Sequence, residues 1–163
     1  MSDLQLSLIV PVYNRPDEIR ELLESLILQT DKEFELVVVE DGSSVRSEEE
    51  IERFSDQLNV KYFYKPNEGP AIGRNYGIER ASGNYFIFVD SDCILPPQYI
   101  AEVKKGLAEN PVDAFGGPDS ADDSFSNLQK ATNYAMTSTL TTGGIRGKKK
   151  RIDKFYPRSF NMG

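Results

Sequence analysis

Two closely spaced carboxylates are the residues of this sequence whose type and spacing most strongly suggest chemistry. Asp90 and Asp92 directly follow the apolar run 86–89, and in an extended chain residues two apart point to the same side. Carboxylates held that close repel each other unless a cation, hydrogen-bond donors or a proton intervenes. The pair therefore suits a hard divalent ion with oxygen ligands. The alternative is that both residues only shape the turn into a helix that starts near Pro96.

The segments that must position these carboxylates alternate between predicted strands and predicted helices. The predicted strands cover residues 6–13, 34–39, 60–64, 85–89 and 112–115. The predicted helices are one of about 14 residues that begins at Pro16, and others at 47–55, 70–81 and 97–110. Continuous apolar strands between helices are typical of a parallel sheet that is covered on both faces. We therefore expect a three-layer α/β/α sandwich with a mostly parallel central sheet.

The regular alternation ends near residue 116, so we expect one α/β domain at 1–115 and a second region at 116–163. Within the second region, residues 125–140 favour a helix, and the glycine-containing segment 141–156 favours a flexible loop. The basic run 148–151 in that loop suits a lipid-linked phosphate or an anionic membrane surface. A solvated loop explains the same charges.

Composition excludes several classes of function. The chain has 163 residues and a net charge of −7, which argues against nucleic acid as a partner. It has no histidine, so a Ser-His-Asp triad is impossible, and its single cysteine excludes a disulfide framework within the chain. No signal peptide and no apolar run of membrane-spanning length are visible, so a cytoplasmic location is expected.

The carboxyl ends of the predicted strands carry residues that suit a nucleoside diphosphate. Ligands of open α/β sheets bind at this edge. Tyr13 offers an aromatic face to a base, and Asp41 offers an acceptor to a base N–H. Asp90 with Asp92 suits a ribose hydroxyl and a metal ion, whereas Arg74 suits either a phosphate or a surface ion pair.

No glycine-rich phosphate loop is present in the sequence. Neither the Walker spacing nor the dinucleotide fingerprint occurs, which disfavours kinases, P-loop hydrolases and NAD enzymes. A sugar nucleotidyltransferase is disfavoured too, because residues 11–14 occupy the place where its glycine-rich loop would follow the first strand. A metal ion is then the main candidate for neutralising a diphosphate.

A set of short motifs extends this interpretation through their order and spacing. The motifs are LIVPVYNRP at 8–16, QT at 29–30, VVEDGS at 38–43, NEG at 67–69, GRNYG at 73–77, ASGNY at 81–85 and VDSD at 89–92. Together they resemble the family 2 glycosyltransferases, enzymes of the GT-A fold that use nucleotide-activated sugars. The resemblance covers the chain through Leu95 and is weaker from there to Gly163.

The resemblance implies roles for five residues. Pro11 and Tyr13 would line the base pocket, and Asp41 would bind the base, most commonly uridine in this family. Asp90 would contact the ribose or the metal, and Asp92 would hold the Mg²⁺ or Mn²⁺ ion that bridges the diphosphate. The sequence departs from the common pattern in one place, where Glu40 stands instead of the more frequent Asp.

The implied activity is transfer of a sugar from a nucleotide donor, most commonly UDP-linked in this family, to a saccharide or lipid-linked acceptor with inversion. It would serve cell-surface polysaccharide synthesis at the cytoplasmic face of the membrane. Residues 155–163 look like the stretch before the family's Gly-Gly-Phe region, so the general base is expected beyond Gly163. The chain is then expected to be a fragment that binds the donor without transferring the sugar. The alternative is a non-catalytic module that binds a nucleotide sugar.

Overall fold

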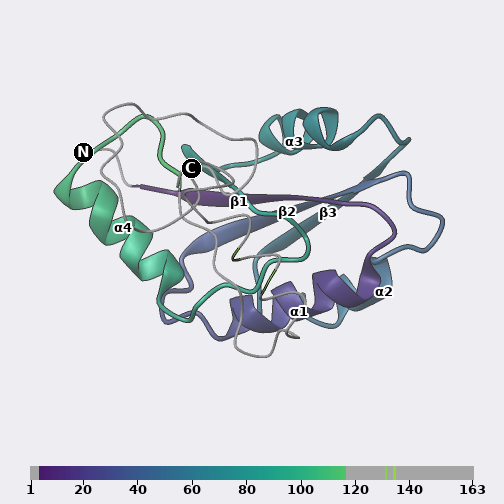
Figure 1. Ribbon diagram of the computed structural model, residues 1–163, viewed down its shortest axis with the longest axis horizontal. Coiled ribbons are helices and arrows are strands. Elements are labelled where there is room, and N and C mark those ends of the chain that lie inside the picture. The colour runs from purple at the N-terminus through teal and green to yellow at the C-terminus, as the bar shows by residue number, and fades with distance from the viewer. Residues whose placement is uncertain (1–3, 117–130, 132–133, 135–163) are drawn as a thin grey trace. The chain divides into compact units, whose positions relative to one another are not determined.

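The computed structural model describes residues 4–116, together with residues 131 and 134 (Figure 1). The strands in this part of the chain are β1 (Leu6–Val12), β2 (Phe34–Asp41), β3 (Val60–Lys65) and β4 (Tyr85–Phe88). The helices are α1 (Pro16–Ile27), α2 (Glu48–Glu52), α3 (Pro70–Ile78) and α4 (Tyr99–Glu109). The strands form a parallel sheet in the order β3-β2-β1-β4.

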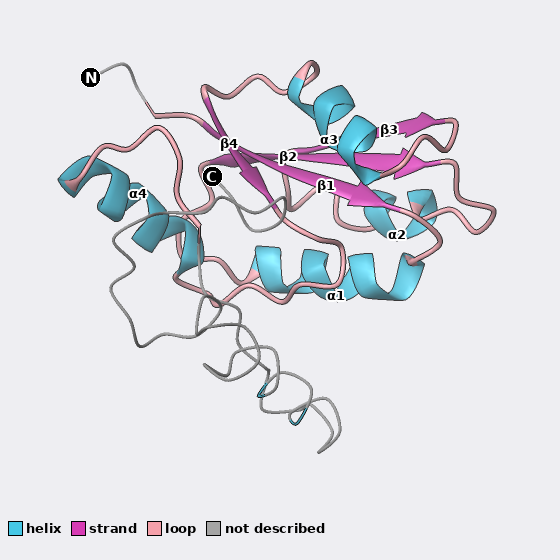
Figure 2. Cartoon of the chain, turned by 45° about the horizontal axis from the view of Figure 1, so that its top comes forward, coloured by secondary structure: helices cyan, strands magenta, loops and turns pink. Residues whose placement is uncertain are grey.

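Helices cover both faces of this sheet (Figures 1 and 2). Helix α3 lies on one face, where Tyr76 packs against the buried residues Ile9 and Val37. The helices α1, α2 and α4 lie on the other face, where the α1 residue Leu22 and the α4 residue Ile100 belong to the larger apolar core. The predicted α/β/α sandwich with a parallel central sheet is therefore confirmed.

Close packing of α3 depends on a glycine. A Cβ atom on Gly77 would lie 2.5 Å from Cγ2 of Ile9, which is fully buried in β1. The missing side chain lets the helix backbone approach the sheet, and it thereby sets the position of Arg74 one turn earlier in the same helix.

The predicted strand at 112–115 is wrong. These residues are irregular and mostly exposed, although Phe115 stacks on Tyr85 with the ring centroids 6.1 Å apart. The segment is short, and Asp113 interrupts its apolar pattern, so it cannot bury both faces as a central strand would. The predicted helix at 125–140 and loop at 141–156 lie outside the described residues, and the domain boundary at 115 stays a prediction. None of the described helices is long and apolar enough to cross a membrane.

A buried polar cluster joins β1 and β2 at the end of the sheet opposite the predicted site residues. Glu35 accepts hydrogen bonds from the Ser7 hydroxyl and the Ser82 N–H, both at 2.7 Å, and pairs with the Lys61 ammonium at 2.5 Å. Burial alone would raise the pKa of Glu35, but the bonds from Lys61, Ser7 and Ser82 outweigh that effect and hold it at about 2. The ionised form of Glu35 therefore stabilises the fold.

We expect Glu35→Gln to destabilise the chain by roughly 3 kcal/mol at pH 7, because the folded-state pKa lies well below the unfolded value. A depressed pKa gives stability that is present above the unfolded pKa of about 4.5 and is lost as pH falls toward about 2. Urea unfolding at pH 7 and pH 3 should thus show the two proteins converging at the lower pH. The control is Glu21→Gln, on the exposed face of α1, and a constant gap between wild type and Glu35→Gln would contradict the prediction.

Candidate functional site

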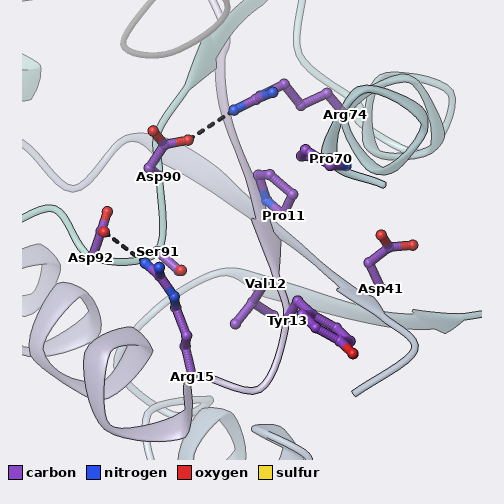
Figure 3. A pocket seen from close by; sticks show the side chains of 10 residues that line it. All are labelled: Pro11, Val12, Tyr13, Arg15, Asp41, Pro70, Arg74, Asp90, Ser91 and Asp92. Carbon is purple, nitrogen blue, oxygen red and sulfur yellow. Dashed lines mark hydrogen bonds and ion pairs between the residues drawn. The ribbon is translucent and has the colours of Figure 1, made fainter. Parts of the chain in front are cut away.

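A pocket of about 490 Å³ opens at the carboxyl ends of β1, β2 and β4, beside the start of α3 (Figure 3). Its lining residues are Pro11, Val12, Tyr13, Arg15, Asp41, Pro70, Arg74, Asp90, Ser91 and Asp92. The residues that the sequence predicted for nucleotide and metal binding are all among them: Pro11, Tyr13, Asp41, Arg74, Asp90 and Asp92. The parallel sheet thus brings together residues up to 81 positions apart, although their roles stay predictions.

Both predicted metal ligands are paired with arginines in the pocket (Figure 3). Arg74 from α3 donates to Asp90 at 2.8 Å, and Arg15 from the start of α1 donates to Asp92 at 2.6 Å. The sequence left Arg74 open between a phosphate ligand and a surface ion pair. The structure shows an ion pair, but one that lines the pocket, with the Arg74 side chain only 13% exposed.

The Arg74 guanidinium also has hydrogen-bonding capacity left over. Its Nε atom is buried and lacks a hydrogen-bond partner among the described residues. An unsatisfied donor on a cation costs free energy, which an anionic acceptor would recover. Arg74 can therefore bind a phosphate in addition to its partner Asp90.

Asp41 lies at the other end of the pocket and is surrounded by donors. It accepts from the Lys65 ammonium at 2.6 Å, from the Glu68 N–H at 3.0 Å and from the Gly69 N–H at 2.8 Å. Burial would raise the pKa of Asp41, but the bonds from Lys65, Glu68 and Gly69 outweigh it and keep the pKa below its ordinary value. Asp41 is therefore a carboxylate at neutral pH, and it can only accept hydrogen bonds.

The same carboxylate fixes the loop that leads into α3. Besides the bonds to the Asp41 side chain, Asn67 donates from its amide to the Asp41 carbonyl at 2.9 Å. Gly42 makes the tight turn after β2 with φ = 73°, and its missing side chain lets the backbone of Asn67 approach. Pro70, at the first position of α3, is thereby held against the pocket.

Glu40, the residue that departs from the common family pattern, faces away from the pocket. It is fully buried and accepts hydrogen bonds from the Ser43 hydroxyl, the Ser47 N–H at 2.8 Å and the Tyr62 hydroxyl at 3.3 Å. Its contacts hold the loop after β2 and do not reach the lining residues.

Asn14 orients the neighbouring pocket residues. It adopts φ = 53°, and its side-chain oxygen accepts from the N–H groups of Ser44 at 2.8 Å and Val45 at 3.0 Å. This ties the end of β1 to the loop after β2. Tyr13 is left 51% exposed at the mouth of the pocket, available for stacking.

Sequence reasoning missed four lining residues, Val12, Arg15, Pro70 and Ser91. Val12, Pro70 and Ser91 adjoin predicted site residues or begin a predicted helix, so their position could have been foreseen. The signal for Arg15 was weaker, because a basic residue after a strand end has many possible partners. Its partner Asp92 is 77 residues away in the sequence.

The carboxylate oxygens of the pocket suit a hard divalent cation that is also coordinated by a bound ligand. Asp90 and Asp92 supply carboxylate oxygens, the atom type that Mg²⁺ and Mn²⁺ prefer. Within residues 4–116, no group of three or more His, Cys, Asp or Glu side chains could hold a metal by itself. Phosphate oxygens and water would therefore complete the coordination, as is usual for Mg²⁺.

The fold and this pocket define an α/β domain of the GT-A type, and comparisons with known proteins show its family. The model of the family "Glycosyl transferase family 2" matches residues 7–163, and the chain belongs to that family. It is 39% identical to the glycosyltransferase GlyA of Streptococcus pneumoniae over 71% of this chain and 17% of the relative. An uncharacterized glycosyltransferase of Rickettsia conorii is also 39% identical, over 68% of this chain and 18% of the relative. The chain thus spans less than a fifth of the length of these two relatives.

Solved structures agree with this assignment. Residues 1–349 of Staphylococcus aureus TarS, which have been solved with UDP and with UDP-GlcNAc, superpose with a TM-score of 0.69 and 31% identity. The match with the UDP complex covers 76% of this chain and 38% of TarS 1–349. The mannosyltransferase PcManGT of Pyrobaculum calidifontis, solved with GDP-Man and Mn²⁺, shares the fold with a TM-score of 0.66 and 24% identity, over 74% of this chain and 37% of that one.

Proposed function

We propose that this chain is the donor-binding part of a glycosyltransferase that takes its sugar from a nucleoside diphosphate, with uridine as the expected base. The observation that carries the proposal is the arrangement of one pocket. A carboxylate that can only accept hydrogen bonds lies at one end, and two carboxylates with two arginines lie at the other.

The Asp41 end of the pocket suits a base that presents an N–H. Uracil N3 and guanine N1 carry a hydrogen and would donate to Asp41, whereas cytosine N3 is an acceptor and would be repelled by the carboxylate. Tyr13 can stack on the base from the mouth of the pocket. The UDP-bound structures of the similar protein TarS support uridine over guanosine.

The opposite end suits a diphosphate. Arg74 supplies a fixed cation that can bond phosphate oxygens. Asp90 and Asp92 would hold Mg²⁺ or Mn²⁺, and Asp90 could also contact the ribose. The bound ion supplies charge neutralisation for the nucleoside diphosphate leaving group.

In the proposed reaction, an acceptor hydroxyl attacks the anomeric carbon, the bond from that carbon to the diphosphate oxygen breaks, and the configuration inverts. A carboxylate base takes the proton of the hydroxyl. Asp41, Asp90 and Asp92 are engaged with basic or N–H groups, so they are poor candidates for this base. We propose that the base comes from outside the described residues, in the acceptor-binding region of the enzyme.

The acceptor is proposed to be a saccharide or a lipid-linked saccharide of a cell-surface polysaccharide, used at the cytoplasmic face of the membrane with peripheral membrane contact. The alternative of a non-catalytic binding module is not favoured, because the similar proteins are named glycosyltransferases.

Calorimetric titration of the 163-residue chain with UDP, GDP, dTDP and cytidine diphosphate, each with and without Mn²⁺, tests the proposal. We expect UDP to bind more tightly when Mn²⁺ is present. Asp92→Asn should remove most of that enhancement, a loss of about tenfold to a hundredfold, because a charged metal ligand becomes neutral. The control Asp56→Asn changes an exposed carboxylate in the turn after α2 and should behave as wild type.

Absence of binding to every nucleotide, by a chain shown to be folded, would count against the donor site. Nucleotide binding that Mn²⁺ does not affect would support the nucleotide site and contradict the proposed metal site. Binding of cytidine diphosphate as tightly as UDP would contradict the role of Asp41.

A further inference from the structure

Arg15 and Asp92 form an ion pair inside the pocket, at the point where a metal ligand was predicted (Figure 3). Nη1 of Arg15 lies 2.6 Å from Oδ2 of Asp92. Arg15 precedes the first turn of α1 and Asp92 follows β4, so the pairing of β1 with β4 brings them together. The Arg15 guanidinium is therefore bonded to a carboxylate oxygen of Asp92 that a divalent cation would use as a ligand.

The two arginines of the pocket differ in how far their side chains are exposed. The Arg15 side chain is 47% exposed and its partner Asp92 is 52% exposed, whereas Arg74 is only 13% exposed. Exposed ion pairs contribute little to stability, because solvent screens the charges and ordering the side chains costs entropy. Arg15 can thus leave Asp92 at small cost, while packing holds Arg74 in place.

We propose that Arg15 is an exchangeable counter-ion. It neutralises Asp92 while no nucleotide sugar is bound, and it moves to the diphosphate when a divalent cation replaces it at Asp92. The proposal rests on the proposed function, because it needs a diphosphate in this pocket. It makes Arg15 a competitor of the metal and a ligand of the nucleotide. The exchange is chemically feasible because a guanidinium forms bidentate hydrogen bonds with carboxylates and with phosphates.

Arg15→Gln should shift two affinities in opposite directions. Without nucleotide, Mn²⁺ should bind about threefold to fivefold more tightly, because no cation has to be displaced from Asp92 and none repels the ion. With saturating Mn²⁺, when Arg15 has left Asp92, UDP should bind about tenfold more weakly to the variant, because one charged hydrogen-bond donor to the diphosphate is lost. A residue with a purely structural role would not produce this opposition.

The experiment measures Mn²⁺ binding without nucleotide through the electron paramagnetic resonance signal of the free ion, and UDP binding by calorimetry at saturating Mn²⁺. Arg20→Gln is the matched control, because it removes the same charge from α1, where Arg20 pairs with Asp17 at 3.3 Å outside the pocket lining. Arg15→Lys keeps the charge but not the planar guanidinium, and it should fall between wild type and Arg15→Gln. Thermal unfolding of each variant verifies that it is folded.

Each result decides between the two proposals. Unchanged or weaker Mn²⁺ binding in Arg15→Gln, or an equal gain in Arg20→Gln, would overturn the exchange while the donor site stands. A wild-type chain that is folded but binds neither Mn²⁺ nor UDP would overturn the proposed function and the exchange with it.

Discussion

Asp41→Ala is expected to lower both the stability of the chain and its affinity for UDP. The backbone N–H groups of Glu68 and Gly69 would lose their acceptor, at a cost of about 1–3 kcal/mol each. The Lys65 ammonium, 4% exposed, would also lose its buried carboxylate partner and keep the exposed carboxylate of Glu68, at 2.9 Å. Loss of the proposed bond to the base N–H should weaken UDP binding about tenfold to a hundredfold. Urea unfolding and calorimetry measure the two effects.

A second variant separates folding from binding. Lys65→Met combined with Asp41→Ala removes the ammonium together with its partner, and replacing a buried ion pair by apolar groups is often tolerated. The double variant should recover part of the lost stability and none of the lost UDP affinity. Recovery of binding along with stability would mean that Asp41 acts only by holding the loop at 67–69. The single variant Lys65→Met, which keeps the Asp41 carboxylate, completes the double-mutant cycle.

The positions of Asp41, Asp90 and Asp92 could be predicted because they depend on a rule of topology. Apolar runs covered on both faces form parallel strands, and parallel strands place their carboxyl ends at one edge of the sheet. No side-chain conformation enters that argument. The family motifs then supplied the roles, which sequence spacing alone left open.

The pairing of these residues could not be predicted, because it depends on side-chain direction and on partners far away in the sequence. Arg15 pairs with Asp92 across 77 residues, and Lys65 pairs with Asp41 across 24. The sequence holds 26 acidic residues, and nothing in it says which of them lies beside a given basic side chain. The prediction of a strand at 112–115 was wrong for a related reason, since a short apolar run does not reveal whether a neighbouring strand is available to pair with it.

Gly42→Ala is expected to destabilise the chain by about 3 kcal/mol and to weaken UDP binding. The positive φ of 73° costs an alanine about 1–2 kcal/mol. The added Cβ would also lie 2.4 Å from the backbone N of Asn67, so the loop at 67–69 would have to move. That movement would pull the Glu68 and Gly69 N–H groups away from Asp41, which joins the stability effect to the binding effect.

Gly69→Ala is the matched control for the close approach. Gly69 also has a positive φ, 91°, but an added Cβ would meet nothing within 4 Å. Its alanine variant should therefore show only the conformational cost of a residue at φ = 91° and ψ = 162°, about 1–3 kcal/mol. Urea unfolding of the two variants isolates the contact with Asn67, and calorimetry with UDP should show a loss for Gly42→Ala that Gly69→Ala does not share. Equal destabilisation would mean that the loop at 67–69 yields without cost, and Asp41 would then not be held by the geometry of that turn.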